Sequence, residues 1–375
     1  MKYHDLTSSL RVPYIGQGFG GIRDGSKSSN LEEEIYIKSL ITGIENGLTL
    51  IDTAEAYAEG YSEELIGKAV LGRRADVQIA TKFSPENNYF NDVIKSAEKS
   101  LKRLQTDYID LYQIHWPNPM VPIAETISAM EHLVLQGKVL SIGVSNFSTR
   151  DLKEASSVLT SGVIVTNQVE YNLFDRFIEE SQFPFCRDNN IKIIAYSPLD
   201  KGRTTDGDLR HQLLSNLSAK YSRTVEQIAL NWLTTSEMVI AIPTSRSQTH
   251  IIENSQSLDF SLSIEDRNRI DIQCAATPEY IDPKQISVSL SGEGNRLAYQ
   301  TISEAIENKL GLCPSPLELA EFIKNGDPIK PVRLILSKEN GNVKTHDLVE
   351  GRLRYWAWVL AFSGEKAVPA YVRYD

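Results

Sequence analysis

The sequence lacks most features that mark secreted, membrane and nucleic-acid-binding proteins. It has three cysteines in 375 residues, and Cys186, Cys274 and Cys313 form no CxxC pair, metal-ligand spacing or disulfide framework. No apolar run approaches the ~18 residues that a membrane span needs. Residues 1–5 lead into no apolar signal core. The formal net charge of -10 disfavours general nucleic-acid binding. We therefore expect a cytoplasmic protein without a membrane segment or a metal site.

Length and charge distribution indicate two domains. A chain of 375 residues suggests about two domains at roughly 150 residues each. Residues 281–375 contain 12 basic and 12 acidic residues, so the first 280 residues carry the whole charge deficit, with 27 basic against 37 acidic (39 − 12 and 49 − 12). The segment 277–283 contains two prolines and little hydrophobic periodicity. We place one domain at 1–280 and a second at 281–375.

The first domain alternates apolar runs with segments of helical periodicity. Runs rich in Val, Ile and Leu between turn residues are typical of buried parallel strands. They occupy residues 14–21, 48–53, 77–83, 108–115, 139–145, 163–171, 191–198 and 238–243. Segments with helical spacing lie between them at 31–44, 63–70, 90–104, 123–135 and 224–233. Eight strands alternating with helices predict an α/β fold, a (β/α)8 TIM barrel. A doubly wound sheet is the alternative, but no GxGxxG follows the first strand.

Four polar residues at or just after predicted strand ends form a set suited to acid–base chemistry. In a (β/α)8 barrel the active site lies at the carboxyl ends of the strands. Asp52, Lys82 and His115 stand there, and Tyr57 follows Asp52. A nearby ammonium such as Lys82 lowers the pKa of a tyrosine hydroxyl, and a carboxylate keeps that ammonium in place. His115 can hydrogen-bond a substrate carbonyl.

Each of these four residues has a simpler interpretation when it is taken alone. A single Asp, Lys or His at a strand end is more often structural or solvated, and Tyr57 alone is more often a packing residue. Four complementary residue types on adjacent strand ends favour a shared function. Together they predict protonation of a carbonyl oxygen while a hydride arrives at carbon.

The same strand ends carry motifs that resemble one enzyme family. The motifs are IDTA at 51–54 followed by Tyr57, ATKF at 80–83, YIDLYQIHWP at 108–117, GVSNF at 143–147, NQ at 167–168 and AYSPL at 195–199. In this order they resemble the aldo-keto reductase family over residues 1 to about 280. The resemblance implies an enzyme that reduces an aldehyde or ketone to an alcohol, with Asp52, Tyr57, Lys82 and His115 as the catalytic tetrad and Tyr57 as proton donor.

The resemblance also implies a nicotinamide cofactor site. Ser145, Asn146 and Gln168 would hold the carboxamide, and Tyr196 would stack on the ring. The other residues implied to contact the cofactor are Ser197, Pro198, Leu199, Ser245, Arg246, His250, Glu253 and Asn254.

Cofactor choice depends on the residues after Pro243. Many relatives have a lysine where this chain has Thr244, but another subset has an arginine that matches Arg246. A guanidinium suits the 2′-phosphate, so we favour NADPH over NADH. The alternative for Arg246 is a surface arginine without a ligand, and for Glu253 and Asn254 it is a helix-face hydrogen-bonding role.

The barrel sequence says little about the substrate. Phe19 and Trp116 could wall a substrate pocket, although Trp116 could equally serve packing alone. In the family, substrate choice depends heavily on loops and on a C-terminal segment. In this chain that segment is replaced by the second domain.

The second domain has a different pattern of elements. Helical patterns occupy 299–309, 316–325 and 351–362, and strand-like runs occupy 332–336, 345–349 and 368–372, with a turn at 339–342. This pattern predicts a small α+β domain.

The motif around Gly351 resembles the ParB N-terminal, or sulfiredoxin-like, domain. The resemblance is carried by DPI at 327–329, PV at 331–332, LVEGRLR at 348–354 and VPAYV at 368–372, in which Gly351 and Arg354 match the family and Glu350 stands for its acidic residue. Relatives bind nucleotide phosphates at this turn, so the resemblance implies a second site at Glu350, Gly351, Arg352 and Arg354 for ATP or CTP with Mg²⁺. Arg352 and Leu353 depart from the family's usual pair, and no cysteine supports sulfinic-acid reduction. The alternative is a strand, turn and helix with solvated arginines and inward-packed tryptophans.

Three functions compete at this point. The leading one is an NADPH-dependent carbonyl reductase with an appended nucleotide-binding or interaction domain. The second is a non-catalytic regulator that senses NADP, and the complete tetrad argues against it. The third is a nucleotide-binding or nucleotide-hydrolysing protein in which the ParB-like domain does the work. The oligomeric state cannot be read from the sequence.

Overall fold

The structure is a computed structural model that describes residues 2–20, 30–200, 209–288, 299–312, 314–336 and 346–373. It divides into two compact units, Met1–Ala275 and Ala276–Asp375, which we call unit 1 and unit 2. The division lies just before the segment 277–283 at which the charge distribution changes. Among the described residues, no helix combines the length and apolarity that a membrane span requires.

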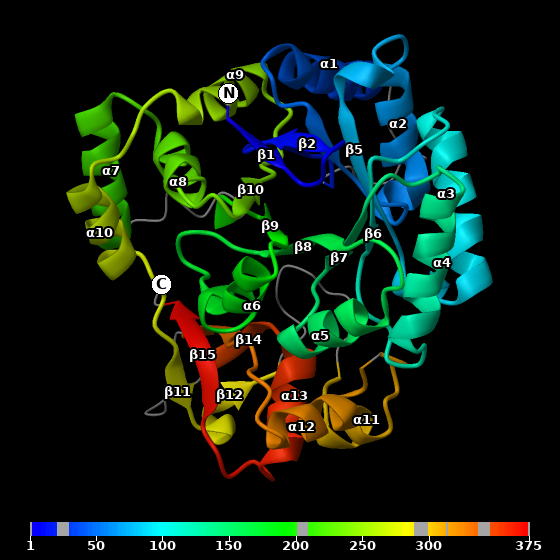
Figure 1. Ribbon diagram of the computed structural model, residues 1–375. Helices are drawn as coiled ribbons and strands as arrows, with labels where there is room; N and C mark the ends of the chain where they lie inside the picture. The colour runs from blue at the N-terminus through cyan, green and yellow to red at the C-terminus, as the bar shows by residue number, and fades with distance from the viewer. Residues whose placement is uncertain are drawn as a thin grey trace. The chain divides into compact units, whose positions relative to one another are not determined.

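Unit 1 is built on eight parallel strands that close into a barrel (Figure 1). The strands are β3 (Gln17–Gly18), β4 (Leu50–Asp52), β5 (Gln78–Phe83), β6 (Leu111–Ile114), β7 (Ile142–Ser145), β8 (Ile164–Glu170), β9 (Lys192–Tyr196) and β10 (Val239–Ala241). Neighbours in this order are paired, and Ile15 bridges to Ala241 to join the first strand to the last. The Gly16 N–H donates to the Ala241 carbonyl at 2.8 Å across this closure. The predicted (β/α)8 barrel is confirmed, and a doubly wound sheet is excluded because that sheet would not close.

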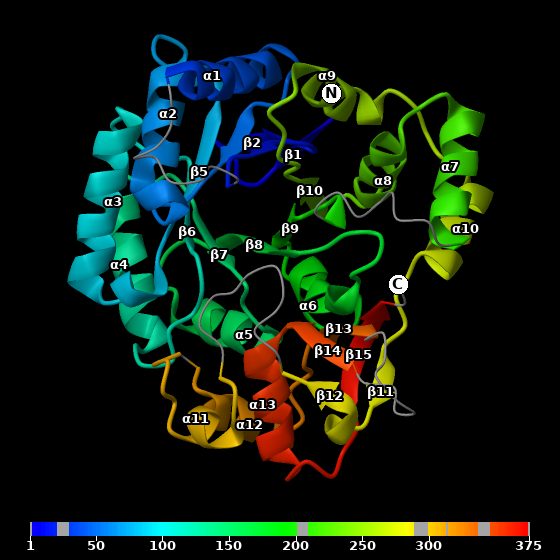
Figure 2. The ribbon, with the colours of Figure 1, turned by 180° about the vertical axis from the view of Figure 1, so that it is seen from behind.

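Helices surround the barrel, as Figures 1 and 2 show from opposite sides. They are α1 (Asn30–Glu45), α2 (Tyr61–Ala69), α3 (Phe90–Leu104), α4 (Ile123–Leu135), α5 (Thr149–Val158), α6 (Gln182–Asp188), α7 (Leu209–Tyr221), α8 (Val225–Leu233), α9 (Gln248–Ser255) and α10 (Ile264–Gln273). Thr224 caps α8 with the predicted capping box, in which its hydroxyl accepts from the Gln227 N–H and the Gln227 side chain returns a bond. All five predicted helical segments are confirmed.

The interior of the barrel changes from apolar to polar along its axis. At the amino ends of the strands, Leu50, Ala80 and Leu111 belong to an apolar cluster capped by the hairpin of β1 (Tyr3–Asp5) and β2 (Arg11–Pro13). Two residues further along β4, β5 and β6 the inward positions hold the polar side chains of Asp52, Lys82 and Gln113. Side chains on a strand alternate between faces, so a step of two residues keeps all three side chains inside the barrel and nearer to the carboxyl ends of the strands.

Unit 2 is a five-stranded mixed sheet with helices. Its strand order is β11-β15-β13-β14-β12. The elements are β11 (Glu279–Ile281), β12 (Ile286–Ser287), α11 (Ile302–Ile306), α12 (Pro316–Lys324), β13 (Val332–Leu336), β14 (His346–Glu350), α13 (Arg352–Ala361) and β15 (Val368–Arg373). Buried Trp356 and Trp358 on α13 belong to the core of this unit.

The predictions for unit 2 hold for most elements and fail at its beginning. The strands at β13, β14 and β15 and the helices at α12 and α13 are confirmed. The sequence analysis did not predict β11 or β12, because strands of three and two residues are too short to show periodicity. Helix α11 is shorter than the predicted 299–309. The predicted turn at 339–342 and Cys313 lie outside the described residues.

Candidate active site

A buried ion pair joins two of the four predicted catalytic residues. Lys82 Nζ lies 2.8 Å from Asp52 Oδ2 and also donates to the Thr53 carbonyl at 2.7 Å. Both side chains are almost fully buried. Burial by itself would lower the pKa of the Lys82 ammonium, but the Asp52 carboxylate and the neighbouring Tyr57 raise that pKa above its ordinary value. Lys82 is therefore a cation at neutral pH.

Tyr57 and His115 complete the cluster. The Tyr57 ring lies with its centroid 5.2 Å from Lys82 Nζ and contacts the His115 ring edge to face, at 5.7 Å between centroids. Burial, together with the charge on Lys82, lowers the pKa of His115 to about 3. The imidazole is therefore neutral at neutral pH and can donate one ring N–H. The structure brings all four residues together at the carboxyl ends of β4, β5 and β6.

The chain after Tyr57 has an unusual backbone. Ala58 and Glu59 have φ of 50° and 56°, and Gly60 continues in the left-handed region before α2 begins. A left-handed conformation costs a residue with a Cβ on the order of 1–2 kcal/mol, so surrounding contacts must hold this turn. The turn positions the Tyr57 side chain beside Lys82.

A second polar group lies near the carboxyl ends of β7, β8 and β9. Asn146 donates from Nδ2 to the His115 carbonyl and accepts from the Tyr196 hydroxyl at 3.2 Å. The Ser145 hydroxyl donates to the Gln168 carbonyl at 3.0 Å. Gln168 Nε2 donates to Asp52 Oδ1 at 2.7 Å, which joins this group to the ion pair. The residues predicted to hold the carboxamide and the ring thus lie in one network with the tetrad.

The AYSPL motif continues from the end of β9. Ser197 has φ of 48°, and its carbonyl accepts from Asn172 Nδ2 at 3.2 Å. Pro198 is buried, and Leu199 is half-buried against the core of unit 1. The motif therefore forms a tight, well-bonded turn beside Tyr196.

The segment after β10 leads into α9. Arg246 is exposed, and its Nη1 donates to the Tyr36 hydroxyl at 3.4 Å. No carboxylate of the described residues is within ion-pair distance of Arg246. The Ser247 side chain caps α9, and the Ser245 hydroxyl accepts from the Ser247 N–H at 3.1 Å.

The remaining predicted cofactor residues lie on α9 itself. His250 is exposed in the first turn, Glu253 is half-buried and Asn254 is buried. The Glu253 carbonyl accepts from Gln227 Nε2 at 2.9 Å. The hydrogen bond at Glu253 thus also links α9 to α8.

The two residues predicted to wall a substrate pocket differ in their placement. Trp116 is 48% exposed, on the loop that follows His115. Phe19 is 5% exposed, because its N–H bonds to the Asp52 carbonyl and its ring packs edge-on against Tyr36. Phe19 therefore presents little surface to a substrate, and Trp116 remains the candidate.

Sequence reasoning missed two residues of this region. Gln113 Nε2 lies 3.5 Å from Asp52 Oδ1, beside the Gln168 contact. Tyr36 contacts Arg246 from α1, 210 positions away in sequence. The position of Gln113, two residues before His115 on a strand, was a usable signal for an inward side chain. Tyr36 had no such signal, since a tyrosine on a helix face is ordinarily a packing residue.

Comparisons with known proteins agree with this geometry. The profile described as "Aldo/keto reductase family" matches residues 15–274. This chain belongs to that family. It is 35% identical over 263 residues to methylglyoxal reductase YeaE of Escherichia coli. This alignment covers 70% of this chain and 91% of that protein. It is 32% identical over 271 residues to a glyoxal reductase of Bacillus subtilis, covering 71% and 90%.

A solved structure extends the comparison to the fold. An aldo-keto reductase from Klebsiella pneumoniae in complex with NADPH matches with a TM-score of 0.66 and 36% identity, covering 70% of this chain and 92% of that one. The chain is thus an aldo-keto reductase and an oxidoreductase. The family match ends at residue 274, so the ParB resemblance of unit 2 stays a prediction.

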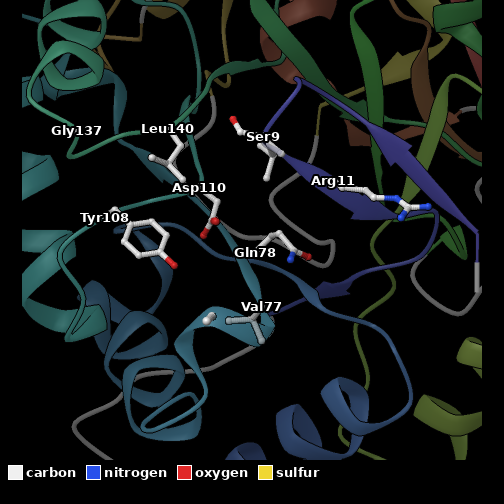
Figure 3. Close-up of a pocket in the computed structure, with 10 residues that line it drawn as sticks. Ser9, Arg11, Val77, Gln78, Tyr108, Asp110, Gly137 and Leu140 are labelled. Carbon is white, nitrogen blue, oxygen red and sulfur yellow. The ribbon is translucent and has the colours of Figure 1, made fainter.

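Unit 1 also has a cavity of about 470 Å³ away from the tetrad (Figure 3). Its lining includes Arg11 from the hairpin and Gln78, Tyr108 and Asp110 near the amino ends of β5 and β6. Asp110 Oδ2 accepts a hydrogen bond from Arg74 Nη2 at 2.6 Å and another from the Ile79 N–H at 2.9 Å. The cavity contains none of the predicted site residues. No cluster of three metal-ligating side chains occurs in the described parts of either unit.

The predicted nucleotide turn of unit 2 is held by its own side chains. Gly351, with φ of 95°, precedes α13. Arg354 Nη1 donates to the carbonyls of Lys330 and Pro331 at 2.9 and 3.0 Å. Glu350 lies 3.7 Å from Arg354 Nη2 and 3.5 Å from Arg333 Nε. Arg354 therefore holds the turn against the segment that precedes β13.

Proposed function

We propose that this chain reduces an aldehyde or ketone to an alcohol with NADPH. The observation that carries the proposal is the buried Lys82–Asp52 pair beside Tyr57 and a neutral His115. Bound NADPH supplies the hydride that adds to the carbonyl carbon. The carbonyl oxygen then takes the Tyr57 hydroxyl proton, so the product is the alcohol.

Each residue of the tetrad has a separate task in this proposal. The Lys82 charge stabilises the phenolate that proton transfer leaves on Tyr57. Asp52 balances the buried Lys82 charge and holds the ammonium in place. His115 donates its ring N–H to the substrate oxygen and orients it toward Tyr57. A complete tetrad of this kind argues against a non-catalytic NADP sensor.

The chain offers groups that fit the cofactor. Ser145, Asn146 and Gln168 would hold the carboxamide, and the half-buried Tyr196 would stack on the nicotinamide. Arg246 would bind the 2′-phosphate, since it is an exposed cation without a carboxylate partner in the described chain. Ser245, His250, Glu253 and Asn254 would surround the adenosine part, with Ser197, Pro198 and Leu199 beside the ring.

Tyr57→Phe tests the proposal. The variant keeps the ring and removes the acid, so kcat should fall on the order of 10²–10⁴-fold while the Kd for NADPH stays nearly unchanged. Methylglyoxal and glyoxal are the first substrates to assay, because the names of two relatives specify them. Steady-state NADPH oxidation measures turnover and fluorescence titration measures binding. Near wild-type turnover in the variant would mean that another group supplies the proton.

We also propose that unit 2 is a ParB-like domain that binds ATP or CTP with Mg²⁺ at Glu350, Gly351, Arg352 and Arg354. The left-handed Gly351 at the start of α13 supports this, because the first N–H groups of a helix favour an anion. The competing proposal is a packing or interaction module, which the bonds of Arg354 to Lys330 and Pro331 support.

A further inference from the structure

We infer that Tyr36 determines cofactor specificity by holding Arg246 in position for the 2′-phosphate. The inference rests on the proposed function, in which Arg246 binds that phosphate. Tyr36 is a positioning residue here, since it acts through Arg246.

The contact joins two helices of unit 1. Tyr36 lies on α1 and Arg246 lies just before α9, and these helices pack side by side (Figures 1 and 2). Arg246 Nη1 donates to the Tyr36 hydroxyl at 3.4 Å. The guanidinium carbon is 5.8 Å from the centre of the Tyr36 ring, within the range of a cation–π contact. One aromatic side chain thus contacts the guanidinium both through its hydroxyl and through its ring.

Tyr36 is itself fixed by the barrel. Its side chain is 7% exposed, and its ring meets Phe19 edge-on at 5.7 Å. The Phe19 N–H bonds to the Asp52 carbonyl at 2.8 Å, at the end of β4. An exposed arginine ordinarily samples many rotamers, and ordering it on a ligand costs entropy. A rigid partner at the guanidinium reduces that cost before the cofactor arrives.

The chemistry of the partner matters as much as its position. A carboxylate would hold Arg246 more firmly but would cancel the charge that a phosphate requires. The Tyr36 hydroxyl accepts a hydrogen bond and adds no charge. Tyr36 therefore restricts the guanidinium and leaves its full charge for the 2′-phosphate. NADH lacks this phosphate, so the effect is specific to NADPH.

Four variants of the full chain test the inference. Tyr36→Phe removes the hydroxyl and keeps the ring against Phe19. Tyr61→Phe is the matched control, because it also removes a tyrosine hydroxyl that contacts α1, but that hydroxyl donates to Glu33. Arg246→Ala and the double variant Tyr36→Phe/Arg246→Ala complete a double-mutant cycle with the wild type and Tyr36→Phe. Fluorescence titration gives Kd for NADPH and for NADH in each protein.

We expect Tyr36→Phe to raise the Kd for NADPH about threefold to tenfold and to leave the Kd for NADH within about twofold. Tyr61→Phe should change neither, and the double variant should bind NADPH no more weakly than Arg246→Ala alone. An unchanged Kd for NADPH in Tyr36→Phe, equal losses for both cofactors, or additive losses in the double variant would overturn the inference. Equal losses for both cofactors in Arg246→Ala would instead overturn the assignment of Arg246, and the role of Tyr36 with it.

Discussion

At the scale of single residues, burial decides which protonation states the site uses. Lys82 and His115 are both bases, yet Lys82 is kept charged by Asp52 while His115 is kept neutral by burial and by Lys82. The two pKa values move in opposite directions because the charged neighbours differ. The Asp52 carboxylate stabilises the charged form of Lys82, whereas the Lys82 ammonium destabilises the charged form of His115. In the proposed mechanism, a neutral imidazole beside a charged lysine would separate two roles, orientation of the substrate by His115 and stabilisation of the phenolate by Lys82.

The low pKa of His115 predicts a loss of stability in acid. The folded pKa is about 3 and the unfolded pKa is about 6.5, so below pH 6.5 the unfolded state binds more protons. Stability is therefore unaffected by this group above pH 6.5 and falls as the pH drops toward 3. Between pH 7 and pH 5 the linked loss is about 1–2 kcal/mol.

Urea unfolding of the wild type and of His115→Gln at pH 7 and pH 5 measures this loss. His4, whose pKa burial lowers to about 4, contributes equally in both proteins, so the difference between them isolates His115. We expect the wild type to lose about 1–2 kcal/mol more than the variant. Identical losses of stability would show that unfolding between pH 7 and pH 5 adds no proton to His115, which would contradict the low pKa of the folded state.

At the scale of elements, left-handed residues mark both turns on which the proposals depend. Ala58 and Glu59 follow Tyr57, and Gly351 precedes α13. A Cβ on Gly351 would lie 3.0 Å from Arg354 Nη2 and 3.2 Å from its guanidinium carbon. The φ of 95° therefore favours glycine at 351, and a Cβ there would also require the Arg354 guanidinium to shift.

Gly351→Ala should destabilise the chain by more than the free-energy cost of placing an alanine in the left-handed backbone conformation. Gly326→Ala is the control, since Gly326 has φ of 92° and a Cβ at this position would meet nothing within 4 Å, so the substitution carries only the backbone cost of about 1 kcal/mol. We expect a further loss of about 1 kcal/mol in Gly351→Ala, from displacement of Arg354. Urea unfolding monitored by tryptophan fluorescence measures both. Equal losses would mean that Arg354 moves aside without cost.

At the scale of the whole molecule, the family match and the structure divide the chain at nearly the same place. The aldo/keto reductase match ends at residue 274 and unit 1 ends at Ala275. The tetrad and the proposed cofactor residues all lie in unit 1. The role of unit 2 is therefore a separate question from the reductase activity.

Calorimetric titration of the full chain with ATP, CTP and ADP, with and without Mg²⁺, tests the nucleotide site. Saturating NADPH is kept in the calorimeter cell so that the barrel site is filled. The proposed site predicts one equivalent of binding that Arg352→Ala weakens about tenfold or more, and that Lys324→Ala, an exposed cation on α12, leaves unchanged. No heat at millimolar nucleotide would leave unit 2 as a packing or interaction module.

The barrel and its eight strands could be predicted from the amino-acid sequence, and the same sequence gives the four residues proposed as the tetrad. Strand periodicity is local, and each proposed catalytic side chain lies at or just after a strand end, so both can be predicted without knowing which segments are in contact. The same holds for the α8 capping box and for the larger elements of unit 2. The short strands β11 and β12 could not be predicted, because pairing with β15 and β14, respectively, makes them strands.

The contacts between distant segments could not be predicted from the sequence, because they depend on how the elements pack. Tyr36 meets Arg246 because α1 packs on α9, and Phe19 is buried because Tyr36 covers it. Gln168 and Gln113 reach Asp52 because barrel closure brings inward side chains of three strands into one layer. The pKa of His115 likewise depends on burial and on Lys82. Such effects depend on distance in space, and the separation of residues along the chain does not encode that distance.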